Sequence, residues 1–258
     1  MSGHTSQGNV GRAAALFEPM SPAAFAPFDG MPGCCALARD TDFGLVWCNG
    51  AYLQERDAAS PEELLGQTIR DVLPADQAGE REALMRPALY LGQTVAYLQM
   101  WKGVRRLTRV WPLDPAAFGH EGYFIIIKTL TDPLPEAAGK GGVMHFVSTG
   151  DLGALAVLSP RELEVFYYLA AGMTVNDTAE ALFRSEKTIG RHVENIHKKM
   201  GYSNRAELVR DAVQRGLVHF TGRQWAELTD PKRALRRDVE KAKTEAEGEA
   251  SGEAGALR

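Results

Sequence analysis

The chain is 258 residues long, 45% of its residues are hydrophobic and 24% are charged, and its formal net charge at pH 7 is −4. Such a composition is typical of a globular protein with two modest domains, and it argues against a membrane-spanning or a largely disordered chain. No N-terminal basic region leads into a long apolar run, so we expect a cytoplasmic protein with no signal peptide and no membrane contact.

Residues 1–33 are rich in Gly, Ala, Ser and Pro, and they lack an apolar pattern long enough to form a core. They predict a flexible N-terminal segment with room for one short helix. The cysteines are Cys34, Cys35 and Cys48, which cannot all pair and show no metal-ligand spacing. This agrees with a reducing compartment, with structural thiols and with no metal site. The alternative is a redox switch in which adjacent Cys34 and Cys35 form a strained disulfide.

Five short apolar runs within residues 34–132 have the lengths and residue types of β-strands. They are Cys35–Arg39, Leu45–Cys48, Thr94–Trp101, Val104–Leu113 and Gly122–Thr129. The first two predict a hairpin, and the last three predict an antiparallel meander. Between the two groups, short helices are predicted at Pro61–Leu65, Gln67–Leu73 and Arg81–Leu91. This order predicts an α+β domain with helices on one face of a five-stranded antiparallel sheet.

That order of elements resembles a PAS sensor domain over residues 34–132. The local agreements are Asn49 at the end of the second strand, the Leu65-Gly66 step, Gly103 and the closing Lys-Thr-Leu-Thr-Asp. The resemblance implies a pocket between sheet and helices that holds a small ligand, haem, flavin or nothing. The Asn-Cys-Arg-Phe-like motif of light-sensing relatives is missing, and no histidine lies between Asp40 and Phe118, which argues against flavin photochemistry and histidine-bound haem. We predict no cofactor and leave an unknown small ligand open.

Four aromatic side chains on the predicted strands are candidates for lining this pocket. They are Trp47, Tyr97, Trp101 and Trp111. Aromatic residues on strands belong to the core more often than to a ligand site, so both interpretations stay open.

Residues 133–156 predict a linker between two domains. The glycine-rich stretch Gly139–Gly142 contains Lys140 but lacks the spacing of a phosphate-binding loop. No set of nucleophile, base and orienting group is recognisable in the sequence, so we do not expect an enzyme.

Four helix-start signals follow one another in residues 157–220. A helix leaves its first N–H groups unpaired, and short oxygen-bearing side chains just before it accept hydrogen bonds from them. The signals are Ser159 with Pro160 and Glu162, Thr174 with Asp177, Ser185 before Glu186, and Asn204 with Glu207. Gly172 and Gly201 supply two of the stops. The segment predicts an all-α four-helix domain.

The third of these helices separates apolar from charged residues. Ile189, Val193, Ile196 and Met200 recur on one side, and Lys187, Arg191, Glu194 and Lys198 form a stripe on the opposite side. Between Arg184 and Arg205, six cations outnumber Glu186 and Glu194, so positive charge is concentrated here in an otherwise acidic chain. Such a helix is typical of one that reads a DNA groove, although a solvated face or a protein-binding bundle gives a similar pattern.

The stretches LSPRELEVFYYLAAG and SEKTIGRHVENIHKKMGYSNRAELV resemble the LuxR-type (NarL-type) helix-turn-helix of bacterial transcription regulators. The resemblance implies that Val175–Phe183 and Glu186–Met200 form the helix-turn-helix and that the latter lies in the major groove. DNA-facing positions of relatives correspond to Lys187, Thr188, Gly190, Arg191, His192, Glu194, Asn195 and Lys198. Lys199 and Arg205 complete the predicted DNA-binding set as flanking cations.

Two positions depart from what a strong DNA binder is expected to show. Gly190 has no side chain where relatives often carry a basic or polar one, and Glu194 is acidic. Glu194 either accepts a hydrogen bond from a cytosine amino group or repels phosphate. Gly190 costs about 1 kcal/mol of helix propensity relative to alanine, which reflects either a close backbone approach to DNA or neutral drift.

Residues 221–258 mix Lys, Arg and Glu and predict a charged, partly disordered tail. The whole pattern favours a transcription regulator that senses a signal through residues 34–132 and binds double-stranded DNA through residues 157–220. Expected partners are DNA, a second copy of the chain and, as a further candidate, RNA polymerase. The competing hypothesis is a scaffold or anti-regulator that uses both domains for protein–protein contacts.

Overall fold

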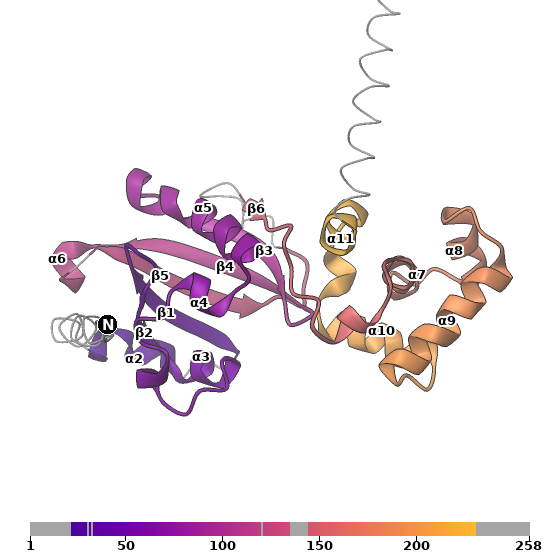
Figure 1. Ribbon diagram of the computed structural model, residues 1–258, viewed down its shortest axis with the longest axis horizontal. Helices are drawn as coiled ribbons and strands as arrows, with labels where there is room; N and C mark the ends of the chain where they lie inside the picture. Colours follow the sequence, from indigo (N-terminus) through magenta and orange to yellow (C-terminus); the bar gives the residue numbers. More distant parts are fainter. Residues whose placement is uncertain (1–21, 30, 32, 120, 135–143, 231–258) are drawn as a thin grey trace, which may run out of the picture. The chain divides into compact units, whose positions relative to one another are not determined.

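The computed structural model describes residues 22–29, 31, 33–119, 121–134 and 144–230. The chain divides into two compact units, Met1–Gly150 and Asp151–Arg258. Among the described residues the first unit combines a sheet with helices, and the second is all-helical (Figure 1). The predicted flexible segment over residues 1–21 and the predicted tail over residues 231–258 lie outside the described residues.

The first unit is built on a six-stranded sheet in the order β2-β1-β5-β4-β3-β6. The strands are β1 (Cys34–Asp40), β2 (Leu45–Cys48), β3 (Val95–Trp101), β4 (Val104–Leu113), β5 (Gly122–Thr129) and β6 (Met144–Phe146). Neighbouring strands pair antiparallel except β6, which runs parallel to β3. The predicted α+β class and its five strands are confirmed. The predicted strand number and purely antiparallel sheet are wrong, because the short β6 adds to the free edge of β3.

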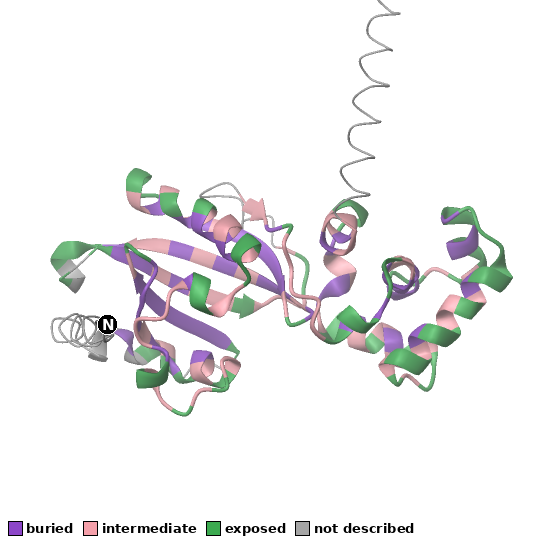
Figure 2. Ribbon diagram, in the orientation of Figure 1, coloured by how far each residue is buried: buried purple, intermediate pink, exposed green. Residues whose placement is uncertain are grey.

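Helical segments between β2 and β3 cover one face of this sheet. They are α3 (Gly50–Glu55), η1 (Pro61–Glu63), α4 (Ile69–Val72) and α5 (Ala75–Leu91). Tyr97, Val110 and Ile125 from three strands pack in one buried cluster with Met85 and Ala88 of α5. Figure 2 shows buried positions in purple along the strands of this sheet. Helix α5 begins at Ala75, six residues before the predicted Arg81. The prediction missed the first turns because they carry no apolar repeat. The short α3 and α6 (Pro115–Phe118) were not predicted.

The opposite face of the sheet carries a smaller apolar cluster under α2 (Pro22–Asp29). Phe25 of α2 is 3% exposed and stacks on Trp47, with ring centroids 4.6 Å apart. Phe124 and Leu113 belong to the same cluster. Helix α2 is thus the one short helix for which the predicted flexible segment 1–33 left room. Its contact with the sheet was not predicted, because one buried aromatic ring is too weak a pattern to reveal a core contact in the sequence.

Part of the predicted linker 133–156 is packed into the first unit. Val147, which follows β6, is fully buried in the main core, and its N–H donates to the carbonyl oxygen of Leu98 at 2.9 Å. The carboxylate of Glu80 on α5 then accepts hydrogen bonds from the backbone N–H and the hydroxyl of both Ser148 and Thr149. The linker prediction is thus wrong for residues 144–149, while residues 135–143 lie outside the described residues.

The second unit contains the four predicted helices and three further helical segments. The helices are α7 (Pro160–Ala170), α8 (Val175–Ala181), α9 (Glu186–Met200) and α10 (Arg205–Gln214), with η3 (Gly153–Val157), η4 (Leu217–His219) and α11 (Gly222–Thr229). All four predicted start signals are confirmed, because Ser159, Thr174, Ser185 and Asn204 each accept a hydrogen bond from a backbone N–H in the first turn of the helix that follows. Helix α9 matches its predicted bounds, and α8 ends two residues before the predicted Phe183.

Helix α7 supplies the centre of this unit. Phe166 is fully buried, and its ring stacks with that of Trp225 from α11 at a centroid distance of 6.2 Å. The indole Nε1 of Trp225 donates to the carbonyl oxygen of Leu163 at 3.0 Å. The predicted charged tail 221–258 is therefore wrong for α11, whose apolar face packs on α7.

The contact between Glu80 and residues 148–149 depends on the charge of a carboxylate. Burial alone would raise the pKa of Glu80, but the hydrogen bonds from Thr149 and Ser148 together outweigh it and hold the pKa below its usual range. A carboxyl group with a lowered pKa contributes stability above its unfolded pKa, and this contribution is lost as pH falls through the folded pKa.

We expect Glu80→Gln to weaken this contact, because an amide nitrogen cannot accept the hydrogen bonds that a carboxylate oxygen accepts. Hydrogen exchange of the Ser148 and Thr149 amides, corrected for intrinsic rates, should show about tenfold lower protection in the variant near neutral pH. In the wild type the protection should decline as pH falls through the lowered pKa of Glu80, and in the variant it should not. Equal protection in both proteins across this range would contradict the assignment.

Candidate nucleic-acid interface and sensor cavity

Two isoleucines fix which side of α9 faces solvent. Ile189 and Ile196 are both fully buried, in a unit where α9 packs against α7 and α8. The opposite side, called here the outer face of α9, is exposed. Its members are Lys187, Arg191, Glu194 and Lys198. The predicted separation of apolar and charged residues is thus present in the structure.

The predicted DNA-binding residues divide into two groups by their surroundings. Thr188 and Asn195 are exposed together with the outer face, while Gly190 and His192 are half-buried beside it. Within the described chain, the cations of the outer face, Lys187, Arg191 and Lys198, form no ion pair. Three cations that already project into solvent from one helix are available to neutralise phosphate or contact base edges.

Lys199 is engaged within the protein. Its Nζ donates to the carboxylate of Glu162 on α7 at 2.7 Å, and the same carboxylate accepts from the N–H and hydroxyl of Ser159, the N-cap of α7. Burial alone would raise the pKa of Glu162, but the hydrogen bonds from Lys199 and Ser159 together lower it. Lys199 therefore ties the last turn of α9 to the first turn of α7.

Arg205 is also held by the protein. It is half-buried at the start of α10, and its guanidinium donates to the carbonyl oxygen of Met173 at 2.6 Å. Met173 lies between α7 and α8, so this contact positions the loop that precedes the helix-turn-helix. Its geometry assigns Arg205 a structural contact in addition to the predicted phosphate contact.

The turn between α8 and α9 exposes a residue that the sequence did not single out. Phe183 is 89% exposed and has a φ of 52°, a left-handed conformation that bulky residues rarely adopt. A single apolar residue after a helix gives no sequence signal of this kind, since the same residue type more often enters the core.

Gly190 occupies an ordinary helical position with space around it. An added Cβ would meet no heavy atom within 4 Å, and its φ is not in the left-handed region. No close contact around this Cβ position in the free protein therefore requires glycine. The two explanations that remain are an approach by a bound molecule and neutral drift.

A cavity of about 90 Å³ lies between the sheet and the helices of the first unit. That volume holds several water molecules or a compact small molecule. Its apolar wall includes Leu37, Ile69, Leu73, Met85, Ile125 and Ile127. Of the four predicted aromatic residues, Tyr97 and Trp101 line it.

Trp47 and Trp111 do not line the cavity, so their prediction as pocket residues is wrong. Successive side chains on a strand point to opposite faces of the sheet. Val110 faces the helices, and its neighbour Trp111 therefore lies on the other face, where its ring contacts Phe124. Trp47 lies there too, under α2.

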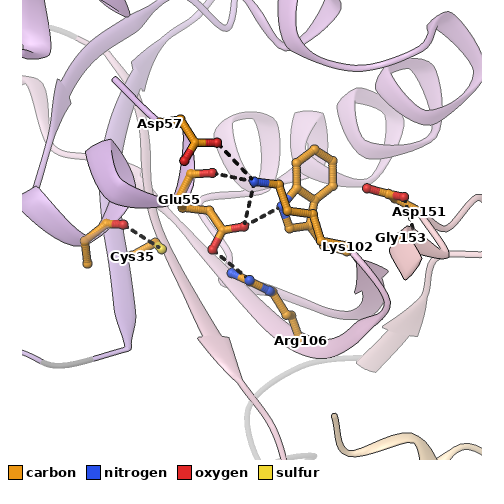
Figure 3. Close-up of polar contacts among 9 residues, drawn as sticks. Cys35, Glu55, Asp57, Lys102, Arg106, Asp151 and Gly153 are labelled. Carbon is orange, nitrogen blue, oxygen red and sulfur yellow. Dashed lines mark hydrogen bonds and ion pairs between the residues drawn. The ribbon is translucent and has the colours of Figure 1, made fainter. Parts of the chain in front are cut away.

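Charged side chains in the cavity wall were missed by sequence reasoning. Four arginines line it, Arg39, Arg56, Arg81 and Arg106, against one carboxylate, Glu55. Glu55 accepts from the guanidinium of Arg106 at 2.8 Å and from the indole Nε1 of Trp101 at 2.8 Å, and the Nζ of Lys102 lies 3.8 Å away. Figure 3 shows Lys102 and Arg106 meeting this one carboxylate. Nothing in the sequence pattern marks these arginines, because charged residues on strands and helices usually face solvent.

The three cysteines are all free and buried. Burial raises the pKa of Cys35 to about 11 and that of Cys48 to about 12. Thiols with such pKa values stay protonated and unreactive near neutral pH, as expected of structural residues. Among the described residues, no group of three or more His, Cys, Asp or Glu side chains is arranged to hold a metal ion.

Two family patterns match the chain. Residues 156–212 match the family described as bacterial regulatory proteins of the luxR family, and residues 28–132 match the PAS fold. The chain thus contains a PAS domain followed in the sequence by a LuxR-family domain. Both predicted resemblances are confirmed, the first over the helix-turn-helix that contains α9 and the second over the sheet that borders the cavity.

Two curated relatives match the chain over a short stretch. The oxygen regulatory protein NreC of Staphylococcus aureus (strain JH9) is 39% identical over 64 residues, which are 25% of this chain and 30% of NreC. NreC of Staphylococcus haemolyticus is 39% identical over 74 residues, 29% of this chain and 33% of that protein. The chain thus spans about a third of the length of the curated relatives it matches.

Matches to solved structures cover more of the chain at low identity. A ligand–DNA complex of VqmA from Vibrio cholerae is 20% identical and has a TM-score of 0.42, covering 78% of this chain and 90% of that one. The PAS domain of BvgS from Bordetella pertussis is 17% identical with a TM-score of 0.34, covering 43% of this chain and 85% of that one.

No helix within the described residues is both long and apolar enough to cross a membrane.

The two neighbouring lysines at the end of α9 should respond differently to substitution. We expect Lys199→Met to lower the free energy of unfolding by about 1 kcal/mol, because it leaves the buried carboxylate of Glu162 without its cation. Lys198→Met should change it by less than about 0.5 kcal/mol. Urea unfolding of both variants measures the difference, and equal losses would contradict a structural role for Lys199.

Substitution of Gly190 tests whether the free protein needs glycine. We expect Gly190→Ala to raise the free energy of unfolding by about 0.5–1 kcal/mol, because alanine favours the helix and its Cβ has open space. Urea unfolding would contradict this if the variant were less stable. The DNA affinity of the stabilised variant then separates a close approach by DNA, which lowers affinity, from drift, which leaves it unchanged.

Proposed function

We propose that this protein is a sequence-specific DNA-binding transcription regulator whose PAS domain senses a small molecule and whose LuxR-family domain delivers the output. The observation that carries the proposal is the outer face of α9, which projects unpaired cations from the second helix of a helix-turn-helix. A helix placed in this way enters the major groove, with residues of its first turns at base edges.

Within that face we assign separate roles to two cations. Arg191 lies in the second turn of α9 and has a fork of donors that matches the acceptor pair of guanine, so it is the candidate base reader. Lys198 lies near the end of α9 and is the candidate phosphate contact. Glu194 between them is exposed and is positioned to accept from a cytosine amino group.

The protein would act as a dimer on paired half-sites, because two-fold symmetric helix-turn-helix proteins place their recognition helices one helical turn of DNA apart. RNA polymerase is a further candidate partner for such a regulator. Its place of action would be the bacterial cytoplasm, where the DNA is. No catalytic role is part of the proposal.

A chain of hydrogen bonds within the first unit offers a route from the cavity to the start of the second unit. The Nε of Arg81, which lines the cavity, donates to the side chain of Gln99 at 2.9 Å, and its NH2 donates to the carbonyl oxygen of Thr149 at 3.2 Å. Thr149 lies two residues before Asp151, where the second unit begins. These hydrogen bonds can be formed or broken. A ligand with a higher affinity for one of these two states would raise the population of that state.

The alternative function is a scaffold or anti-regulator in which the same two domains bind proteins. Glu194 and the missing side chain at Gly190 favour it, because both reduce the expected attraction for DNA. The exposed, unpaired cations of the outer face argue against it, since a surface freed from DNA binding has no need to keep them.

Selection of bound duplexes from a random DNA pool by the purified full-length protein tests the proposal. We expect an enriched motif with two related half-sites whose spacing reports the dimer. If neither the wild type nor Arg191→Ala enriches a DNA motif, the result would favour the scaffold function.

Two substitutions on the selected duplex separate base reading from phosphate contact. Arg191→Ala should cost about 1–3 kcal/mol of binding free energy and relax the preference at one base pair per half-site. Lys198→Ala should weaken binding evenly across sequences and reduce the salt dependence by about one phosphate contact per recognition helix. Fluorescence anisotropy at several salt concentrations measures both, and identical effects on every sequence would remove Arg191 as a reader.

A further inference from the structure

The described wall of the PAS-domain cavity contains more cations than carboxylates. Four arginines and one carboxylate are found among its described lining residues. Arg39 is 3% exposed, yet its hydrogen-bond acceptors are all neutral: the carbonyl oxygens of Phe43 and Gln67 and the hydroxyl of Tyr52. A buried cation is stabilised far more by an anion than by neutral oxygens, so the wall favours a negatively charged guest.

Two of these arginines also retain unused donors. The Nε of Arg56 and the Nε of Arg106 are buried and have no hydrogen-bond partner among the described residues. Arg106 shares Glu55 with Trp101 and Lys102, and one carboxylate cannot satisfy all of these donors together with Arg56. A second carboxylate in the cavity would accept from the donors left over.

The rest of the wall limits the guest to a compact molecule with an apolar body. Ile69, Leu73, Met85, Ile125 and Ile127 line the cavity beside the rings of Tyr97 and Trp101, and its volume is about 90 Å³. Bulky or highly charged anions would bury their charge against this apolar surface at a cost. A small molecule with one carboxylate and a short aliphatic or aromatic body fits both parts of the wall.

We propose that the ligand of this cavity is a small organic carboxylate whose charge is held by Arg56 and Arg106 beside Glu55. This inference rests on the proposed sensing function and names the chemical class of the sensed molecule. The ligand pairs with cations whose donors the cavity wall leaves partly unsatisfied, and its body lies against the aliphatic side chains and the two aromatic rings.

Calorimetric titration of the full-length protein with three carboxylates, each beside its amide, tests the ligand class. The probes are acetate, isovalerate and benzoate, with acetamide, isovaleramide and benzamide as neutral partners of the same shape. We expect at least one carboxylate to bind about tenfold more tightly than its amide, since only the carboxylate pairs with the arginines. The proposal is overturned if no carboxylate binds more tightly than its amide, or if inorganic phosphate binds and the carboxylates do not.

Two substitutions in the cavity should change the affinity in opposite directions. Arg56→Gln should lower carboxylate affinity about tenfold and leave amide binding unchanged, because it removes charge and keeps a polar side chain. Glu55→Gln should raise carboxylate affinity, because it removes the only competing carboxylate in the described wall. A fold damaged by substitution does not bind ligand more tightly, so unchanged or weaker binding by Glu55→Gln contradicts the proposal.

Arg109→Gln is the matched control. Arg109 lies on β4 between Thr108 and Val110, on the opposite face of the sheet, and does not line the cavity. Carboxylate binding should be unchanged in this variant, and a loss equal to that of Arg56→Gln would indicate a general charge effect and overturn the assigned site. Duplex selection on the same preparation separates the two proposals, because an enriched DNA motif without carboxylate preference overturns the ligand class and leaves the regulator standing.

Discussion

The burial of Ile189 and Ile196 against the rest of the second unit is the constraint on which the DNA-binding proposal depends. Full burial of an isoleucine side chain contributes about 1.5–3 kcal/mol, so rotation of α9 about its axis would expose both at a large cost. The same rotation would bury Lys187 and Lys198 away from water. Packing therefore fixes the outer face of α9 toward solvent without any help from DNA, and the tie between Lys199 and Glu162 holds the end of the helix in the same orientation.

The cavity of the first unit depends on a comparable packing constraint, which acts on the sheet. Because side chains alternate between faces, residues at every second position of the strands line one continuous wall beneath α5. Tyr97, Gln99 and Trp101 share that wall on β3, and Arg106 joins them from β4. Apolar groups and cations are thus brought to one cavity, which suits a guest that has both an apolar body and a charge. The hydrogen bond from Arg81 to Thr149 connects the edge of that cavity to a residue next to Gly150, the last residue of the first unit.

Much of the second unit could be predicted because its signals are local. Ser159, Thr174, Ser185 and Asn204 bond to N–H groups within three residues, so each helix start is encoded where it occurs. The misses depend on distant contacts. Residues 144–146 are recognisable as β6 only through pairing with β3, about fifty residues earlier, and Trp225 becomes part of a core through distant contacts with Leu163 and Phe166. The cavity arginines were missed for the same reason, since the packing of strands against helices decides which charged residues turn inward.

The measurement that tests the central claim most directly is hydrogen exchange of the full-length protein with and without its selected duplex, followed along α7 to α10. The account predicts added protection in α9 and at the N-terminus of the helix-turn-helix, with the smallest change in α7, whose residues form the centre of the unit. Protection confined to the sheet of the first unit, or to helices other than α8 and α9, would contradict the assignment of the outer face of α9 as the DNA-binding surface.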